Sequence, residues 1–177
     1  MLTLQPMSGY DIRKTVDASI AHFWNESYGQ IYPILKTLER EGLITANSSG
    51  DGFRNRQEYA ITPEGRAALE AWLSTPPRKE IVRNELLLKL FFARNAPLNR
   101  SFHHLEEYRR SQVAELQHFR RMERQLAREH STHADLPYWL TTLRFGIRHC
   151  EATIRWAEDA IRELQKSAHR KRKADRK

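Results

Sequence analysis

A short segment in the first quarter of the chain combines side chains that can read and hold nucleic acid. Gln30 can pair with adenine edges, Lys36 can reach phosphate or guanine, and Tyr32 can bond a phosphate oxygen through its hydroxyl. Arg40 adds a second cation, and Gly29 permits a close approach of the backbone. These residue types indicate contact with DNA if a single helix presents them to solvent.

The spacing of apolar residues around this segment predicts that helix. Ser27 and Gln30 have the spacing of a capping box, and the helix that they open ends at Glu41-Gly42. Because Pro33 forfeits a backbone hydrogen bond, we expect an irregular first turn or a later start. On a helical wheel one sector holds Ile31, Ile34, Leu35 and Leu38, and the opposite sector holds Gly29, Pro33, Lys36 and Arg40, with Tyr32 beside it.

Two further groups of residues are predicted to hold the DNA backbone. Ser8-Gly9-Tyr10 opens an earlier helix, and the free N–H groups of a helix start can bind phosphate. Arg54 and Arg56 follow a turn-rich stretch and can hold flanking phosphates. The predicted DNA contacts are therefore Ser8, Gly9, Tyr10, Tyr28, Gly29, Gln30, Tyr32, Pro33, Lys36, Arg40, Arg54 and Arg56.

The elements that must position these residues follow the order of a winged helix-turn-helix. A capping box at Ser8-x-x-Asp11 predicts a helix over about 9–20. Leu43–Thr45 and Glu58–Thr62 predict a two-stranded hairpin, and a third helix follows Thr62 as far as residues 74–77. In this order the second helix enters the major groove and the hairpin, or wing, lies along the backbone. We expect residues 1–75 to form this domain.

Beyond Lys79 the sequence predicts only helices, over about 79–94, 99–130 and 136–167, so the fold class is mainly α. The last of them has a heptad pattern typical of a long seam against another helix. That seam comprises Leu140, Leu143, Ile147, Cys150, Ile154, Ala157, Ile161 and Leu164. Since three such helices offer more apolar surface than one chain covers, we expect residues 79–167 to form a homodimerisation region.

The net charge of +8 is concentrated at the C-terminus. Residues 1–78 carry −1, residues 79–165 carry +3 and residues 166–177 carry +6. We predict that residues 168–177 form a basic disordered tail, with non-specific phosphate contacts as the alternative. Charge alone therefore gives no reason to assign DNA binding to the N-terminal domain, and that assignment depends on the arrangement of its residues.

The sequence favours neither an enzyme nor a metal or cofactor site. Glu115-x-x-His118 matches only half of a di-metal motif, and His130-x-x-His133 lacks a nearby cysteine. No nucleophile elbow, P-loop or dinucleotide fingerprint is found. We expect Trp139, Phe145 and Trp156 to lie in the core or the dimer interface, with a ligand pocket as the alternative.

Cysteine usage and apolar runs predict a cytoplasmic protein. Cys150 is the single cysteine and cannot form an internal disulfide, and at a heptad position it is predicted to be a packed thiol. The longest apolar run, Leu86 to Ala93, is far shorter than the roughly 20 residues that span a bilayer. The first residues do not resemble a signal peptide. We therefore expect no membrane contact.

Several motifs of the chain resemble the PadR family of bacterial transcriptional regulators. They are Met7-Ser8-Gly9-Tyr10-Asp11-Ile12, Phe23-Trp24, Ser27-Tyr28-Gly29-Gln30-Ile31-Tyr32-Pro33, Leu35-x-x-Leu38-x-x-Glu41-Gly42-Leu43-Ile44 and Tyr59-x-Ile61-Thr62-x-x-Gly65. Residues 83–92 and 143–146 are similar to the helical C-terminal region of the larger members. The resemblance implies a homodimeric, usually repressing regulator that binds an inverted-repeat operator in double-stranded DNA. It also implies that the C-terminal region, residues 79–167, dimerises and, in some members, responds to a small aromatic effector.

The N-terminal domain departs from the family in one respect. A helix normally precedes the Met-Ser-Gly-Tyr segment, and only residues 1–6 stand in its place here, so we expect either a longer natural chain or lower stability. This short start and the −1 charge of the domain suggest an alternative to the function that the resemblance implies. In that alternative, the chain is a small-molecule-sensing or protein-interaction helical module that has lost DNA binding.

Overall fold

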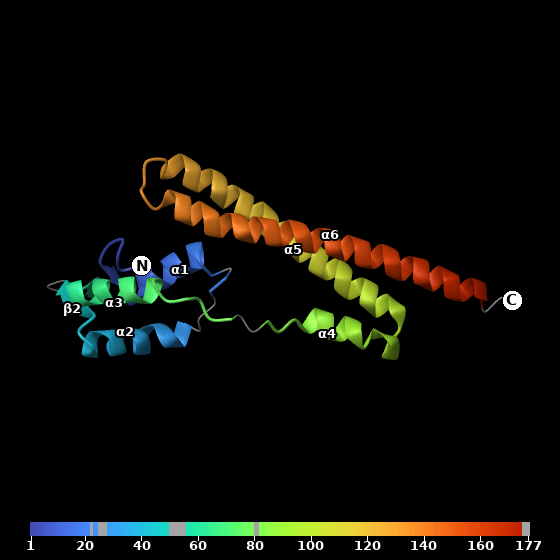
Figure 1. The fold of residues 1–177 in the computed structure, drawn as a ribbon, viewed down its shortest axis with the longest axis horizontal. Helices are drawn as coiled ribbons and strands as arrows, with labels where there is room; N and C mark the ends of the chain where they lie inside the picture. Colours follow the sequence, from blue (N-terminus) through green and yellow to red (C-terminus); the bar gives the residue numbers. More distant parts are fainter. Residues whose placement is uncertain (22, 25–27, 50–55, 80–81, 175–177) are drawn as a thin grey trace. The chain divides into compact units, whose positions relative to one another are not determined.

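The computed structural model of the protein describes residues 1–177 except 22, 25–27, 50–55, 80–81 and 175–177 (Figure 1). The chain divides into two compact units, one up to residue 80 and one from residue 81. Within the described ranges, no helix has the combination of length and apolar composition that crossing a membrane requires.

In its described residues, the first unit combines three α-helices with a small antiparallel sheet. Its elements are β1 (Met7–Ser8), α1 (Gly9–Ser19), the 3-10 turn η1 (Tyr28–Gln30), α2 (Ile31–Arg40), β2 (Ile44–Ser49), β3 (Arg56–Ile61) and α3 (Pro63–Leu73). The strand order is β1-β3-β2, and β2 and β3 form the predicted hairpin. The short strand β1, which pairs Met7 with Tyr59, was not predicted, because two residues are too few to show an alternating pattern.

Local signals in the sequence fix where the helices of this unit begin and end. The capping box is present, since the Asp11 amide donates to Ser8 Oγ at 3.2 Å and the Ser8 amide donates to Asp11 Oδ2 at 3.2 Å. Gly42 has a φ of 72° and ends α2, and the Leu43 amide bonds the Leu38 carbonyl at 2.9 Å. Thr62 caps α3 by accepting from the Gly65 amide at 3.0 Å.

The core of the first unit lies between α2 and the sheet. Leu35 of α2, Ile44 of β2 and Tyr59 of β3 are buried and in contact. Partly buried side chains pack around them: Leu2, Ile12, Ile31, Leu38 and Ala46. This core attaches one face of α2 to the sheet and leaves the opposite face outside it.

The second unit contains α4 (Glu85–Phe91), the 3-10 turn η2 (Ala93–Asn95), α5 (Leu98–Glu129) and α6 (Leu136–Ala174). The long helices α5 and α6 run side by side as an antiparallel hairpin (Figure 1). Phe119 of α5 packs with Leu143, Ile147 and Cys150 of α6, and Leu116, Met122 and Leu126 complete the cluster. Ion pairs tie the two helices together at Arg120–Glu151, with a distance of 2.9 Å, and at Arg144–Glu123, with 2.7 Å.

The heptad seam predicted for the dimer is partly covered by the same chain. Leu143, Ile147, Cys150 and Ala157 are buried in the single chain, and three of them pack on Phe119 of α5. The other seam residues, Leu140, Ile154, Ile161 and Leu164, are only partly buried. A 3.5-residue period indicates that a helix packs against another helix, but it does not indicate whether that helix belongs to the same chain or to a second copy. Here α5 of the same chain is the partner of α6.

Three boundaries of the second unit differ from the predicted ones, and one of them is the end of α4, which lies at Phe91 instead of residue 94. The helix predicted over 79–94 begins only at Glu85, because Asn84 caps it by accepting from the Leu87 amide at 3.0 Å. At the other end, α6 continues to Ala174 through residues 168–174, which were predicted to be disordered. This segment is rich in Lys, Arg and Ala, which favour helix, and cations are stabilised near a helix C-terminus.

The Cys150 thiol provides a test of the hairpin core. Its exposure is 1%, and burial, with a smaller contribution from Glu115, raises its pKa to about 11. The raised pKa favours the protonated thiol in the folded state. The contribution of this thiol to the free energy of unfolding is therefore fully present below the unfolded pKa, near 9, and is lost as pH rises through 11.

We predict that the free energy of unfolding falls between pH 9 and 11 in the parent and falls less in Cys150→Ala. Urea titrations at several pH values measure this difference. In the same range an alkylating reagent should label Cys150 only after unfolding. Rapid labelling of the folded chain at neutral pH would contradict the burial of this thiol.

Candidate nucleic-acid interface

The outward face of α2 presents most of the side chains predicted to contact DNA. Tyr32, Pro33, Lys36 and Arg40 are exposed, and so are Gly29 and Gln30 in the preceding turn η1. On the opposite face Leu35 is only 4% exposed. Ile34, which the helical wheel placed with the core residues, is instead 45% exposed, because it lies at the edge of the buried face.

The start of α2 is built around Pro33. The 3-10 turn Tyr28–Gln30 precedes α2, whose first residue is Ile31, so Pro33 falls within the first turn. Amides of the first turn have no partner inside the helix, and a proline there removes no helical hydrogen bond. The predicted irregular start is therefore confirmed, and it brings Gln30 to the solvent-facing end of the helix.

Gly9 and Tyr32 connect the two segments predicted to contact DNA. A Cβ atom placed on Gly9 would lie 2.7 Å from Tyr32 Cε1 and 3.0 Å from Cζ, so the tyrosine ring rests directly on this glycine. Tyr32 is nevertheless 56% exposed. Because residue 9 has no side chain, the Tyr32 ring can pack directly on its backbone at the surface. No periodicity in the sequence predicts this contact.

The start of α1 is only partly available to a phosphate. Ser8 is 4% exposed, its hydroxyl donates to Asp11 Oδ2 at 2.7 Å, and it also accepts from the Asp11 amide. The capping box therefore occupies the Ser8 side chain, which the sequence had assigned to DNA. Gly9 is buried beneath Tyr32, whereas Tyr10 is 62% exposed and can contact a ligand.

Three of the predicted contacts lie outside what the structure describes. Arg54 is not among the described residues. Tyr28 and Arg56 have a described backbone, in η1 and at the start of β3, but their side chains do not. The positions of these three side chains stay predictions.

The cations of α2 are unneutralised in the described part of the chain. Neither Lys36 nor Arg40 forms an ion pair with a described residue, and both are exposed. Burial raises the pKa of the nearby Tyr59 hydroxyl, and Glu39 and Tyr32 raise it further, so this hydroxyl stays protonated. It donates to Gln57 Oε1 at 3.1 Å. The face therefore carries free positive charge suited to phosphate groups.

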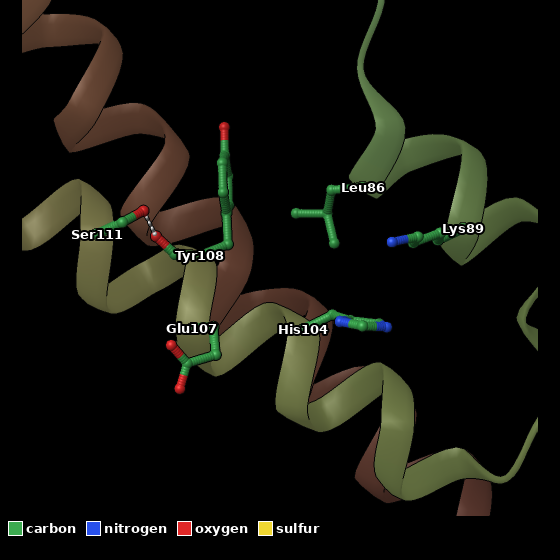
Figure 2. A pocket seen from close by; sticks show the side chains of 6 residues that line it. All are labelled: Leu86, Lys89, His104, Glu107, Tyr108 and Ser111. Atoms are coloured by element: carbon green, nitrogen blue, oxygen red, sulfur yellow. Dashed lines mark hydrogen bonds between the residues drawn. The ribbon is translucent and has the colours of Figure 1, made fainter.

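A shallow pocket of about 380 Å³ lies between α4 and α5 in the second unit (Figure 2). Its lining residues are Leu86 and Lys89 from α4 and His104, Glu107, Tyr108 and Ser111 from α5. Lys89 Nζ pairs with Glu85 Oε1 at 2.7 Å, and the Ser111 hydroxyl donates to the Tyr108 carbonyl at 2.7 Å. Burial raises the pKa of Tyr108, which keeps its hydroxyl protonated.

The tryptophans and Phe145 do not line this pocket. Trp156 meets the Tyr108 ring edge-on, with centroids 6.3 Å apart, and Trp139 contacts the rings of His130 and His133. Phe145 is 67% exposed on α6. Among the described residues, no group of three or more His, Cys, Asp or Glu side chains is arranged to hold a metal ion.

The chain matches two family models in tandem. Residues 1–71 match the transcriptional regulator PadR-like family, and residues 82–165 match the virulence activator alpha C-term family. The chain is 36% identical over 88 residues to the negative transcriptional regulator PadR of Bacillus subtilis, and this match spans 49% of the chain and 48% of PadR. It is 28% identical over 174 residues to the probable transcriptional regulator Rv1176c of Mycobacterium tuberculosis, covering 91% of the chain and 92% of that protein.

Solved structures with the same architecture cover nearly all of the chain. Bacillus subtilis PadR in complex with operator DNA superposes with a TM-score of 0.80 at 24% identity, over 92% of both chains. The same protein in complex with p-coumaric acid gives 0.73 at 26% identity, over 93% of this chain and 94% of PadR. The Vibrio cholerae virulence activator AphA gives 0.73 at 27% identity, over 94% of both chains.

The contact between Gly9 and Tyr32 generates a prediction. The methyl group of Gly9→Ala should displace the Tyr32 ring and lower the free energy of unfolding. In a Tyr32→Ala background the same substitution should not have this cost, because the ring is absent. A double-mutant cycle on the free energy of unfolding should give a coupling of at least about 0.5 kcal/mol, as is usual for residues in contact. The same cycle with Ala18→Ser, at an exposed position of α1, should give almost none. Equal coupling in both cycles would rule out the contact.

Proposed function

Because the chain belongs to the PadR-like family of transcriptional regulators, we propose that it represses transcription by binding an inverted-repeat operator as a homodimer. The observation that carries the proposal is the outward face of α2, where Gln30, Tyr32 and Lys36 are exposed while Leu35 anchors the opposite face. On this proposal the chain acts by binding and not by catalysis, and it works in the cytoplasm, where the operator lies.

The exposed residues divide into those that read bases and those that hold the backbone. Gln30 at the start of α2 has the amide that pairs bidentately with adenine, and Lys36 can reach guanine or phosphate. Arg40, Tyr32 and Tyr10 are suited to phosphate oxygens and so set the register of α2 in the major groove. Arg54 and Arg56 of the wing are proposed to hold the flanking phosphates.

The second copy is proposed to cover the exposed apolar surface of α4. Leu87 is 49% exposed, Leu88 59%, Phe91 81% and Phe92 57%. So many large apolar side chains on one short helix and its C-cap residue, Phe92, are typical of a protein interface. The half-buried seam residues Leu140, Ile154, Ile161 and Leu164 have surface left to extend this contact. Two-fold symmetry would then present two α2 helices to successive major grooves.

The pocket between α4 and α5 is the proposed effector site. Leu86 and Tyr108 offer contacts to an aromatic ring, and Lys89 and His104 can hold an acidic group (Figure 2). The relative that binds p-coumaric acid supports a small aromatic effector of this chemistry. Since α4 contributes both to the pocket and to the proposed dimer surface, a bound effector would bias the dimer through this helix.

The first test concerns operator binding. Tyr32→Ala and Lys36→Ala should weaken binding to the duplex upstream of the gene by about fivefold or more, since each removes a base or phosphate contact of roughly 1–3 kcal/mol. Arg66→Ala, at an exposed position of α3, is the matched control and should leave binding unchanged. Gel-shift titration measures all three. A parent chain with no preference for this duplex would favour the sensing or interaction module instead.

The second test concerns the dimer. Phe91→Asp should convert the dimer to monomer without unfolding the chain, because this side chain is 81% exposed in the single copy and a charge cannot be buried unpaired in the interface. Light scattering gives the mass, and circular dichroism checks the fold. Tyr138→Asp, at a site 73% exposed on α6, is the control. An intact Phe91→Asp dimer would place the interface elsewhere.

A further inference from the structure

The last turns of α6 carry a concentration of positive charge. After Glu163 there is no acidic residue before Asp175, whereas five residues of this stretch are cationic: Lys166, Arg170, Lys171, Arg172 and Lys173. All five lie in α6, which extends to Ala174. The stretch begins beyond residue 165, where the match to the C-terminal family model ends. It is therefore a feature of this chain beyond the region that the family model describes.

The described side chains of this segment share one face of the helix. At 100° per residue, Arg162, Lys166, His169 and Arg170 fall within an arc of about 100°. All four are exposed. The other side holds Ile161, Leu164 and Ala168, which are half-buried and continue the apolar seam. The hairpin thus turns the cations outward.

The unpaired cations of this segment contrast with four paired arginines in the body of the hairpin, where Arg121, Arg124 and Arg155 also form no ion pair with a described residue. Arg109, Arg120, Arg144 and Arg148 each pair with a glutamate. Lys166 and Arg170 form no ion pair with a described residue, and only Arg162, at the edge of the segment, pairs with Asp159. Because like charges three or four residues apart repel on a helix, an external anion would relieve this repulsion.

We propose that this basic end of α6, with the outward-facing Lys166, His169 and Arg170, binds the phosphate backbone of double-stranded DNA without reading its sequence. A duplex offers one negative charge for about every 1.7 Å of its axis, which a straight row of cations can follow. This proposal rests on the proposed function in one respect: it assumes that the polyanion this protein meets is DNA. It adds a contact that is separate from α2.

Two observations favour a duplex over other polyanions. Single strands are held by aromatic side chains on which bases stack, and residues 162–174 contain no Phe, Tyr or Trp. A helix that lies on an acidic membrane needs a broad apolar face with Trp, Phe or Leu. Here the apolar side ends in Leu164 and Ala168, both already half-buried.

The test uses the full chain with Lys166→Gln and Arg170→Gln combined. The matched control is Arg121→Gln with Arg124→Gln, which removes the same charge from exposed positions on α5. Fluorescence anisotropy follows binding to the promoter duplex and to an unrelated duplex of equal length, between 50 and 200 mM salt. The slope of log K against log salt should fall by about 0.9 for each phosphate that the variant no longer neutralises, on both duplexes, and the control should keep the parent slope.

Each outcome decides between the possibilities. A variant with the parent slope, or a control with the same loss as the variant, overturns the proposal. Binding to phosphatidylserine vesicles that the variant loses, with no change on DNA, also overturns it and assigns the surface to a membrane. If the parent shows no preference for the promoter duplex but the variant still loses affinity for both duplexes, the proposed operator function fails while this contact stands.

Discussion

The burial of Leu35 against Ile44 and Tyr59 decides which face of α2 meets solvent. In a helix of ten residues one such anchor fixes the rotation of the whole element, because side chains three or four residues apart must share its face. The sheet that carries Ile44 and Tyr59 is held in register by pairing between β2 and β3. The outward position of Lys36 and Arg40 is therefore a consequence of the core, and their chemistry depends on it.

The absence of a side chain at Gly9 determines where the Tyr32 ring lies on the surface of α2. A side chain there would collide with the Tyr32 ring, so the glycine sets the position of an exposed aromatic side chain on the neighbouring helix. Ser8 and Asp11, next to it, bond each other and fix the start of α1. The segment from Ser8 to Asp11 thus serves the interface mainly by positioning, with Tyr10 as its exposed member.

Sequence reasoning succeeded where a local pattern carries the information. The capping box of Ser8 and Asp11, the proline in the first turn of α2 and the glycine at its end are local signals, and the structure confirms each of them. The capping box predicted at Ser27 and Gln30 is not among them, because Ser27 lies outside the described residues and Gln30 caps α2 without a side-chain hydrogen bond. The contact between Gly9 and Tyr32 joins residues far apart in the chain, and strand β1 is too short for any period, so neither was predictable. The heptad seam of α6 correctly indicated a helical partner, but the pattern alone does not distinguish a hairpin from a dimer.

The central claim is that α2 projects outward from each copy and that the dimer spaces two of them to match DNA. Spin labels at Glu41→Cys, an exposed position at the C-terminal end of α2 that is not among the proposed DNA contacts, in a Cys150→Ala background, report that spacing by pulsed electron resonance on the operator-bound dimer. We predict one narrow distance distribution compatible with half-sites one helical turn apart, about 34 Å, or a multiple of it. A broad distribution, or a distance that no pair of major grooves on one face of a duplex can accommodate, would contradict the account.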